Sequence, residues 1–532
     1  MRPFQRKLSL ACGLFAANVI FTSAPALLAD DDGAEGNWPL AGGNIHNTRS
    51  TSEGPSKSAV PKLQQKWVFT AGGDISATPT VAGDAVYVPD WAGNLYAIDR
   101  NTGKQIWSVQ VPTPAGVTGT VVTRVSPVVH GGDIIIGDLQ GEVPSYVLHK
   151  GANLIAFNRK TGKVHWTTQV DDQGPAIITG SPVVYRDVVY VGISSNEEVV
   201  AIPNSYKCCT FRGSVVAVDA NTGKVLWKTY TIPTNGGKPG GYSGNPVWQT
   251  PAIDPERGLL YVGTGNNYDV PASVLACAAK DPKADCTAHD DYFDTALALD
   301  LKSGRIRWSY KVGTYDAWTV PCVFSPPGTN CPDPAGPDWD LGGSGPNLLK
   351  NVVVFGQKSG FLWAFDPEDG KLRWSTMVGP AGIFGGIEWG TATDGKRIYA
   401  AISNSSHVPT KLIPSGQTAT GGFWNAIDAA TGKILWQTAD PDGAPDYGAV
   451  SEANGVVYGG SLSGKMYALD AQTGAILWHF TSASLTPGAA PGSVIDGPSI
   501  VDGVLYWGSG YGRVGGTGGN RLYAFSVPES DN

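Results

Sequence analysis

The sequence predicts an all-β protein, an eight-bladed β-propeller with tryptophan-docking repeats whose ring is closed by the N-terminal strand. The phrase LYAIDRNTGKQIW, ending at Trp107, recurs in seven near-copies along the chain. An eighth tryptophan, Trp67, stands near the N-terminus without the phrase, and an eighth phrase, LYAFSVPES, ends the chain without its tryptophan. Regular repeats indicate solenoids, propellers or arrays, and a repeat split between the two ends of the chain is how a ring closes.

Each phrase predicts two strands joined by a polar turn. In the first copy, residues 95–99 alternate as a strand does, the turn contains Thr102 and Gly103, and a second strand carries Trp107. Two more short strands precede the phrase, over 76–90. Four such strands form a propeller blade. The recurring glycine and tryptophan predict that the indole of one blade lies on the turn of its neighbour, and the strand at 66–69 supplies the outer strand of the last blade.

The first thirty residues differ from the rest of the chain. Arg2, Arg6 and Lys7 precede an apolar run over 8–21, and small residues follow before Asp30. This order is typical of a secretory signal, so we assign 1–29 to a signal peptide and 30–532 to the propeller. The alternative is an N-terminal membrane anchor, for which the apolar run is short. No later segment is apolar enough to span a bilayer, which predicts a periplasmic or secreted protein.

Cysteine usage agrees with export. Cys12 lies in the leader, and six cysteines remain. They form three local pairs: Cys208 with Cys209, Cys277 with Cys286, and Cys322 with Cys331. An even number in an exported protein favours disulfides, and the alternative for the adjacent pair is two free thiols. No spacing matches CxxCH or a zinc pattern, so neither a covalent haem nor a structural zinc is predicted.

The charge balance limits the partners. The net charge is -8, and about -11 once the three basic residues of the leader are removed. An acidic surface argues against nucleic-acid binding and favours a basic protein partner.

A propeller binds ligands near its axis, where the innermost strands and their loops converge. Blades three to five carry long insertions and the segments that depart most from the repeat. These segments are GISSNEE at 192–198, KCCTFRGS at 207–214, NPVWQTPAIDP at 245–255, GTGNNYD at 263–269, DWDLGG at 338–343 and FGQKSG at 355–360.

Together with the repeated phrase, these segments resemble the eight-bladed quinoprotein alcohol dehydrogenases, which bind pyrroloquinoline quinone (PQQ) and calcium. SSNEE followed by CCTFRGS is most similar to the polyvinyl alcohol dehydrogenase branch. The resemblance extends from about Trp38 to the end of the chain. For cofactor binding it implies Arg124, Thr179, Ser194, Trp248 and Lys358. For metal binding it implies Glu197, Asn266 and Asp340.

The chemistry of PQQ explains these residue types. A flat ortho-quinone with three carboxylates needs an aromatic floor, which Trp248 would supply, and cations, which Lys358 and Arg124 would supply. Calcium takes hard oxygen ligands such as Glu197 and the amide oxygen of Asn266. A carboxylate must also remove the hydroxyl proton of the alcohol.

That base is where the chain departs from the family pattern. The family places it in a DxWD segment soon after the fourth-blade tryptophan, where this chain has Thr319, which cannot act as a base. Two carboxylates could take the role, Asp316 in TYDAWT and Asp340 in DWDLGG. We favour Asp340, displaced along the chain by a disulfide-closed insertion. Gly342, two residues further on, is not a second acid, which favours calcium over a lanthanide.

The resemblance therefore implies PQQ- and calcium-dependent oxidation of an alcohol to a carbonyl. The implied substrate is a secondary alcohol or polyol, such as polyvinyl alcohol. Because the chain lacks CxxCH, the electrons would pass to a separate cytochrome c. Two alternatives stay open: a non-catalytic scaffold of the outer-membrane assembly type, and a PQQ-dependent sugar or aldehyde dehydrogenase. Against the scaffold, Cys12 lies inside the apolar run and not after it, as a lipid anchor would require.

Overall fold

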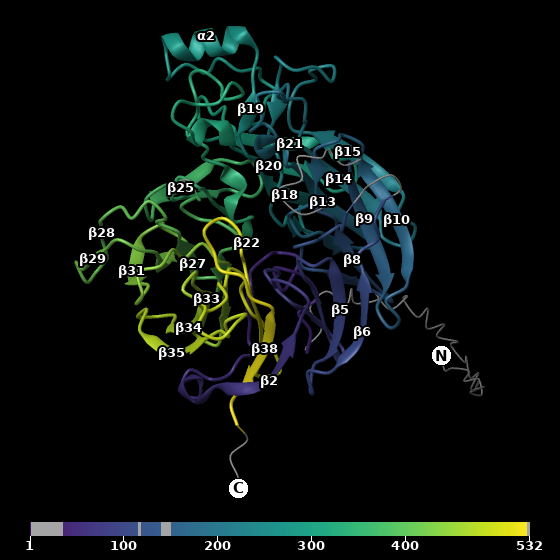
Figure 1. Ribbon diagram of the computed structural model, residues 1–532, viewed down its shortest axis with the longest axis vertical. Helices are drawn as coiled ribbons and strands as arrows, with labels where there is room; N and C mark the ends of the chain where they lie inside the picture. The colour runs from purple at the N-terminus through teal and green to yellow at the C-terminus, as the bar shows by residue number, and fades with distance from the viewer. Residues whose placement is uncertain (2–35, 115–118, 140–150, 383, 529–532) are drawn as a thin grey trace.

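The fold is a ring of eight blades around a central axis, each built on four antiparallel strands, with one further strand added to each of two blades (Figure 1). This computed structural model describes residues 36–114, 119–139, 151–382 and 384–528, besides Met1. The predicted eight-bladed propeller is confirmed. The signal peptide predicted over 1–29 lies, apart from Met1, outside the described residues.

The first four blades follow one another along the chain, each running from an inner strand to an outer one. Their strands are β3 (Thr80–Ala82), β4 (Ala85–Pro89), β5 (Asn94–Asp99) and β6 (Gln105–Gln110); β7 (Val128–His130), β8 (Asp133–Gly137), β9 (Ala152–Asn158) and β10 (Val164–Asp171); β12 (Val183–Tyr185), β13 (Val188–Ser195), β14 (Ser214–Asp219) and β15 (Val225–Tyr230); β17 (Ala252–Asp254), β18 (Leu259–Gly263), β20 (Thr295–Asp300) and β21 (Ile306–Lys311).

The next four blades complete the ring. Their strands are β22 (Asn347–Leu349), β23 (Val352–Gly356), β24 (Phe361–Phe365) and β25 (Leu372–Met377); β26 (Ala392–Thr393), β27 (Arg397–Ile402), β30 (Phe423–Asp428) and β31 (Ile434–Ala439); β32 (Val450–Ala453), β33 (Val456–Gly460), β34 (Lys465–Asp470) and β35 (Ile476–Thr481); β36 (Ser499–Val501), β37 (Val504–Ser509), β38 (Arg521–Ser526) and β2 (Gln64–Thr70).

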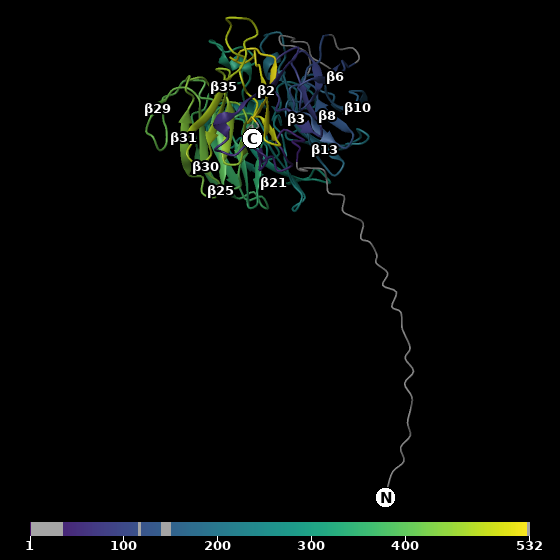
Figure 2. The ribbon, with the colours of Figure 1, turned by 90° about the horizontal axis from the view of Figure 1, so that it is seen from below.

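The last blade joins the two ends of the chain, as the split repeat predicts. The N-terminal strand β2 pairs antiparallel with the C-terminal strand β38, and Trp67 lies opposite Ala524. Next to this junction the indole of Trp478, in β35, donates to the carbonyl of Leu63 at 3.1 Å. Figure 2 shows β2 and β35 close together at this seam. The ring is therefore closed both by a shared sheet and by a docked tryptophan.

Tryptophan docking recurs at every blade boundary. Eight indoles each donate a hydrogen bond to a backbone carbonyl of the neighbouring blade, namely those of Trp67, Trp107, Trp166, Trp227, Trp308, Trp374, Trp436 and Trp478. Trp308 shows why the turn needs glycine. Its Nε1 lies 3.0 Å from the oxygen of Pro367, and a Cβ on Gly370, at φ +71°, would come within 2.5 Å of the ring. The predicted packing of indole on turn is confirmed.

The N-terminal segment 38–51 closes the axis from one end. It forms backbone hydrogen bonds to the inner strands or their approaches in six blades, reaching Val81, Val129, Ile253, Leu348, Thr393 and Glu452 in turn. Arg49, 3% exposed, donates to the carbonyls of Val450 and Ala41. A small polar cavity of about 50 Å³ lies beside it. The larger opening of the axis is therefore on the other face.

The remaining short elements lie in the N-terminal segment, in the insertions of blades three to five and in a hairpin of blade six. These are the helices η1 (Val60–Lys62), α1 (Glu197–Val200), α2 (Ala272–Lys280), η2 (Val320–Val323) and η3 (Leu341–Gly343), and the strands β1 (Ser50–Thr51), β11 (Ala176–Ile177), β16 (Ser243–Gly244), β19 (Asn267–Asp269), β28 (Thr410–Lys411) and β29 (Thr418–Ala419). All three predicted cysteine pairs form disulfides, including the adjacent pair. No helix in the described part of the chain is long and apolar enough to cross a membrane.

Candidate functional site

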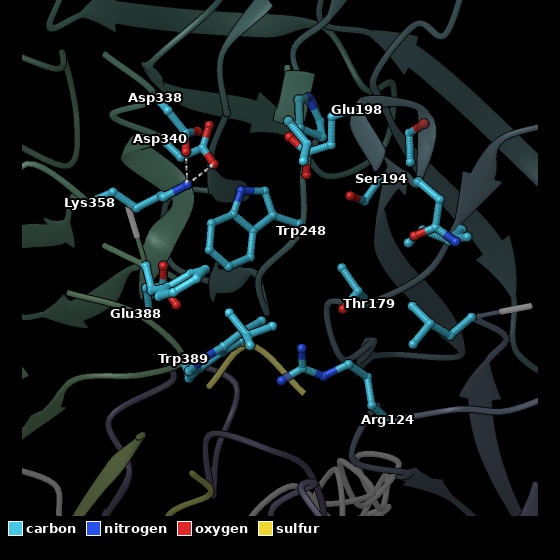
Figure 3. A pocket seen from close by; sticks show the side chains of 18 of the residues that line it. Arg124, Thr179, Ser194, Glu198, Trp248, Asp338, Asp340, Lys358, Glu388 and Trp389 are labelled. Carbon is cyan, nitrogen blue, oxygen red and sulfur yellow. Dashed lines mark hydrogen bonds and ion pairs between the residues drawn. The ribbon is translucent and has the colours of Figure 1, made fainter. Parts of the chain in front are cut away.

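A cavity of about 570 Å³ opens on the ring axis and contains six of the residues singled out from the sequence. They are Arg124, Thr179, Ser194, Trp248, Asp340 and Lys358 (Figure 3). Ser194 belongs to β13, and the others lie on loops that lead into or out of the inner strands. The convergence on the axis explains how side chains more than two hundred residues apart line one cavity.

An aromatic floor lies on the axis. The rings of Trp248 and Trp389 meet edge to face, with centroids 5.3 Å apart. The Arg124 guanidinium stacks on Trp389, with Cζ 3.6 Å from the ring centroid. Trp248 Nε1 is buried and has no hydrogen-bond partner among the described residues. A planar ligand stacked in this cavity would find an aromatic face, a cation and a free indole donor together.

Lys358 is the second cation of the cavity and is held by two aspartates. Its Nζ lies 2.7 Å from Oδ2 of Asp338 and 3.6 Å from Oδ2 of Asp340 (Figure 3). Burial acts to lower the pKa of Lys358, but Asp338 and Asp340 outweigh it and hold that pKa well above its ordinary value. Lys358 is therefore a fixed positive charge in the cavity.

The two glutamates of SNEE point to different places. The Glu197 carboxylate is fully buried away from the cavity and accepts hydrogen bonds from the Tyr206 hydroxyl, from the amide and hydroxyl of Thr210, and from the Phe211 amide. Glu198 instead lines the cavity, near Lys358 and Asp340. Burial raises the pKa of Glu198 to about 7. The structure thus places Glu198, and not Glu197, on the wall of the cavity.

Asn266 and Asp340 are brought together. The Asn266 amide nitrogen donates to Oδ1 of Asp340 at 2.7 Å. The Asn266 side-chain nitrogen donates to the carbonyls of Asn267 and Trp318. The side-chain oxygen Oδ1 of Asn266 is therefore the atom of this residue that could bind a cation. Within the described residues, no three His, Cys, Asp or Glu side chains gather into a metal site. A cation here would need oxygen atoms from Asn266 and from a bound ligand as well as from carboxylates.

Asp316, the alternative base, does not line the cavity. It is 1% exposed, and its carboxylate accepts the amides of Asp338 and Trp339. Burial raises the pKa of Asp316 to about 7, while the two amides act to lower it. Of the two candidate bases, Asp340 therefore lines the cavity and Asp316 does not.

The cavity residues missed from the sequence include four that bear directly on its chemistry, namely Glu198, Asp338, Glu388 and Trp389. Asp338 and Glu198 stand one or two positions from residues that were singled out, so the segments that contain them were already marked as part of the site. Glu388 and Trp389 lie in GGIEWG of blade six, where no distinguishing pattern marks them. Glu388 is 8% exposed, and burial raises its pKa to about 7.

Comparison with known proteins gives consistent matches. A PQQ family, described as glucose/ethanol/alcohol dehydrogenase, beta-propeller domain, matches residues 38–326, and outer membrane protein assembly factor BamB matches 421–529. Polyvinylalcohol dehydrogenase of Pseudomonas sp is 32% identical over 92% of this chain and 77% of its own length. Polyvinylalcohol dehydrogenase of Sphingopyxis sp. (strain 113P3) is 33% identical over 88% of this chain and 73% of its own.

Solved structures share the propeller. Quinohemoprotein alcohol dehydrogenase from Comamonas testosteroni superposes with a TM-score of 0.66 at 22% identity, over 94% of this chain and 83% of that one. BamB from Moraxella catarrhalis gives 0.52 at 13% identity, over 87% and 99%. At these identities the likeness shows the fold alone.

Proposed function

This chain belongs to the glucose/ethanol/alcohol dehydrogenase family of PQQ β-propellers, and we propose that it oxidises an alcohol to a carbonyl compound with PQQ and calcium bound in the axial cavity. One observation carries the proposal: an aromatic floor, two cations and four carboxylates converge in a single cavity on the axis. The substrate is a secondary alcohol or polyol, as the names of the polyvinylalcohol dehydrogenases suggest.

The residues present suit a flat tricarboxylate. Trp248 offers a ring face, and Arg124 and Lys358 offer charge for carboxylate and quinone oxygens. Thr179 and Ser194 add hydroxyl groups to the lining. The unpartnered Trp248 Nε1 supports the same interpretation, because a buried indole N–H without an acceptor is costly unless a ligand supplies one.

The residues present also suit calcium, with one change from the sequence-based prediction. The proposed protein ligands are Glu198, the amide oxygen of Asn266, and Asp340, which are the hard oxygen donors that calcium prefers. Glu197 is replaced because its carboxylate already accepts four hydrogen bonds on the far side. Bound calcium would supply a Lewis acid beside the reacting oxygen.

Asp340 is the proposed base. Its Oδ1 is fixed by the Asn266 amide and its Oδ2 faces Lys358, so the carboxylate is held at the cavity wall while it accepts the hydroxyl proton of the alcohol. Bound PQQ supplies the quinone that takes up the hydrogen of the carbinol carbon as hydride. The proposed electron acceptor is a separate cytochrome c, a protein partner that would suit the net charge of -8. We also propose that residues 1–29 are a signal removed on export to the periplasm or medium.

The reaction is tested with purified protein loaded with PQQ and calcium. Dye reduction is followed with 2-hexanol, 2,4-pentanediol and glucose. We expect turnover with the secondary alcohols, and a loss of kcat on the order of a hundredfold or more in Asp340→Asn with PQQ still bound. Normal turnover in Asp340→Asn would exclude it as the base. Oxidation of glucose alone would favour the sugar dehydrogenase alternative.

The choice between the two glutamates has its own test. Glu198→Gln should raise the calcium concentration needed for half-maximal activity, because it removes a proposed ligand. Glu197→Gln should lower the thermal stability of the protein and leave the calcium requirement unchanged. The reverse pattern would return the ligand role to Glu197.

A further inference from the structure

Asp316 lies directly beneath the loop that carries Asp340. Its Oδ1 accepts the amide of Asp338 at 3.1 Å, and its Oδ2 accepts the amide of Trp339 at 2.7 Å. These are the two amides that immediately precede Asp340. We propose that Asp316 is a positioning residue, whose carboxylate holds the loop 338–340 in the shape that presents Asp338 and Asp340 to Lys358.

The loop has a conformation that needs such support. Asp338 has φ +61°, in the left-handed region that residues other than glycine rarely adopt. Each oxygen of the Asp316 carboxylate accepts one amide, so a single side chain can hold two consecutive peptide groups of this backbone in place. Asp338 Oδ2 then accepts a hydrogen bond from Lys358 Nζ at 2.7 Å, and the two form an ion pair.

The opposite side of the loop is tied to the Lys358 segment. The Gln357 side chain donates to the carbonyl of Trp339 at 2.7 Å, and the Lys358 amide donates to the carbonyl of Asp340 at 3.1 Å. Asp316 on one side and residues 357–358 on the other therefore hold three consecutive residues. Without Asp316 the loop keeps only one of its two supports.

Asp316 also contacts the segment that contains Asn266, the second residue that holds Asp340. Its carbonyl accepts the Asn267 amide at 2.9 Å, next to Asn266, whose own amide donates to Asp340. Gly336 packs against Asp316: an added Cβ would lie 2.3 Å from Oδ1 of Asp316, 2.5 Å from the backbone nitrogen of Ala317 and 2.8 Å from Cα of Asp316. A methyl group at residue 336 would consequently displace Asp316, its carboxylate included, without removing its charge.

The geometric part of the proposal is tested on the protein without cofactor. Hydrogen exchange by mass spectrometry is measured on peptides covering 336–341 in Asp316→Asn and Gly336→Ala. We expect exchange at the amides of Asp338 and Trp339 to quicken about tenfold in both variants. The matched control is Asp254→Asn, which alters a buried carboxylate of the same blade that accepts the Arg257 amide and does not touch the loop. Unchanged exchange in Asp316→Asn would overturn the proposal.

The catalytic part rests on the proposed function and uses the holoenzyme. Both loop variants should bind PQQ as the wild type does and keep KM within about threefold, while kcat falls on the order of tenfold to a hundredfold. The isotope effect with a carbinol-deuterated secondary alcohol should rise, which a general loss of stability would not cause. Wild-type kcat in Asp316→Asn with a loosened loop would refute the positioning role. An inert wild-type holoenzyme would refute the proposed function, and the exchange result would still decide the geometry.

Discussion

The stability of the cofactor-free protein should depend on pH through Glu388. This side chain is 8% exposed in the axial cavity, and burial raises its pKa from 4.5 to about 7, while Lys358 and Arg124 oppose the shift. The perturbation is Glu388→Gln, which keeps the shape and removes the charge.

The sign follows from proton linkage. Between pH 4.5 and 7 the folded state holds the Glu388 proton and the unfolded state has released it, so folding stability falls as pH rises and levels off above pH 7. A pKa raised by this amount corresponds to about 3 kcal/mol of unfolding free energy. Glu388→Gln has no proton to release at this position, so its stability does not change with pH through this residue. Its free energy of unfolding, relative to that of the wild type, should therefore rise from pH 4.5 to 7 and be higher by about 3 kcal/mol at pH 8.

Thermal unfolding of both proteins from pH 5 to 8 measures this difference. For a chain of this length, 3 kcal/mol moves Tm by roughly 3 °C. The control is Glu256→Gln, which changes an exposed glutamate and should leave the pH profile unaltered. Parallel profiles for Glu388→Gln and the wild type would refute the reasoning, because they would show that burial does not hold Glu388 neutral.

Two further predictions concern packing and charge. Gly370→Ala places a methyl group 2.5 Å from Trp308 at φ +71° and should lower the free energy of unfolding by about 2 to 4 kcal/mol. The control Gly395→Ala, at φ +81° with nothing within 4 Å, should lower it by only about 1 kcal/mol. Equal losses of Tm would contradict indole docking as the reason for the glycine. Asp338→Asn breaks a buried pair with Lys358 and should cost about 3 kcal/mol or more. Asp442→Asn, at a partly exposed pair with Lys465, should cost under about 1 kcal/mol, and similar costs for the two would refute burial as the cause.

The ring was predictable because its rule is local and repeated. Each turn glycine and the tryptophan one strand later occupy fixed positions in the phrase, so seven copies and a split eighth were enough to give the blades and their closure. The axial location of the cavity followed from the same geometry. Six of the nine singled-out residues line it, and four of these six, Ser194, Trp248, Asp340 and Lys358, stand in segments that depart from the repeat.

The remaining differences come from the orientation of side chains. Helix α1 begins at Glu197, and adjacent residues of a helix point in different directions, so the loop 206–211 captures Glu197 while Glu198 faces the cavity. Asp316 meets the loop at 338–339 only because the insertion between them folds back, which spacing along the chain does not reveal. Glu388 and Trp389 lie at the axis only in the closed ring, and the segment GGIEWG has no local sequence pattern that predicts this position.

Calorimetric titration of PQQ into the purified protein in the presence of calcium tests the central claim most directly. The account predicts saturable binding of one PQQ per chain, with affinity lost in Trp248→Ala, because that change removes the ring floor of the cavity. Absence of binding to the wild-type protein would contradict the enzyme assignment and favour a non-catalytic scaffold built on the same ring.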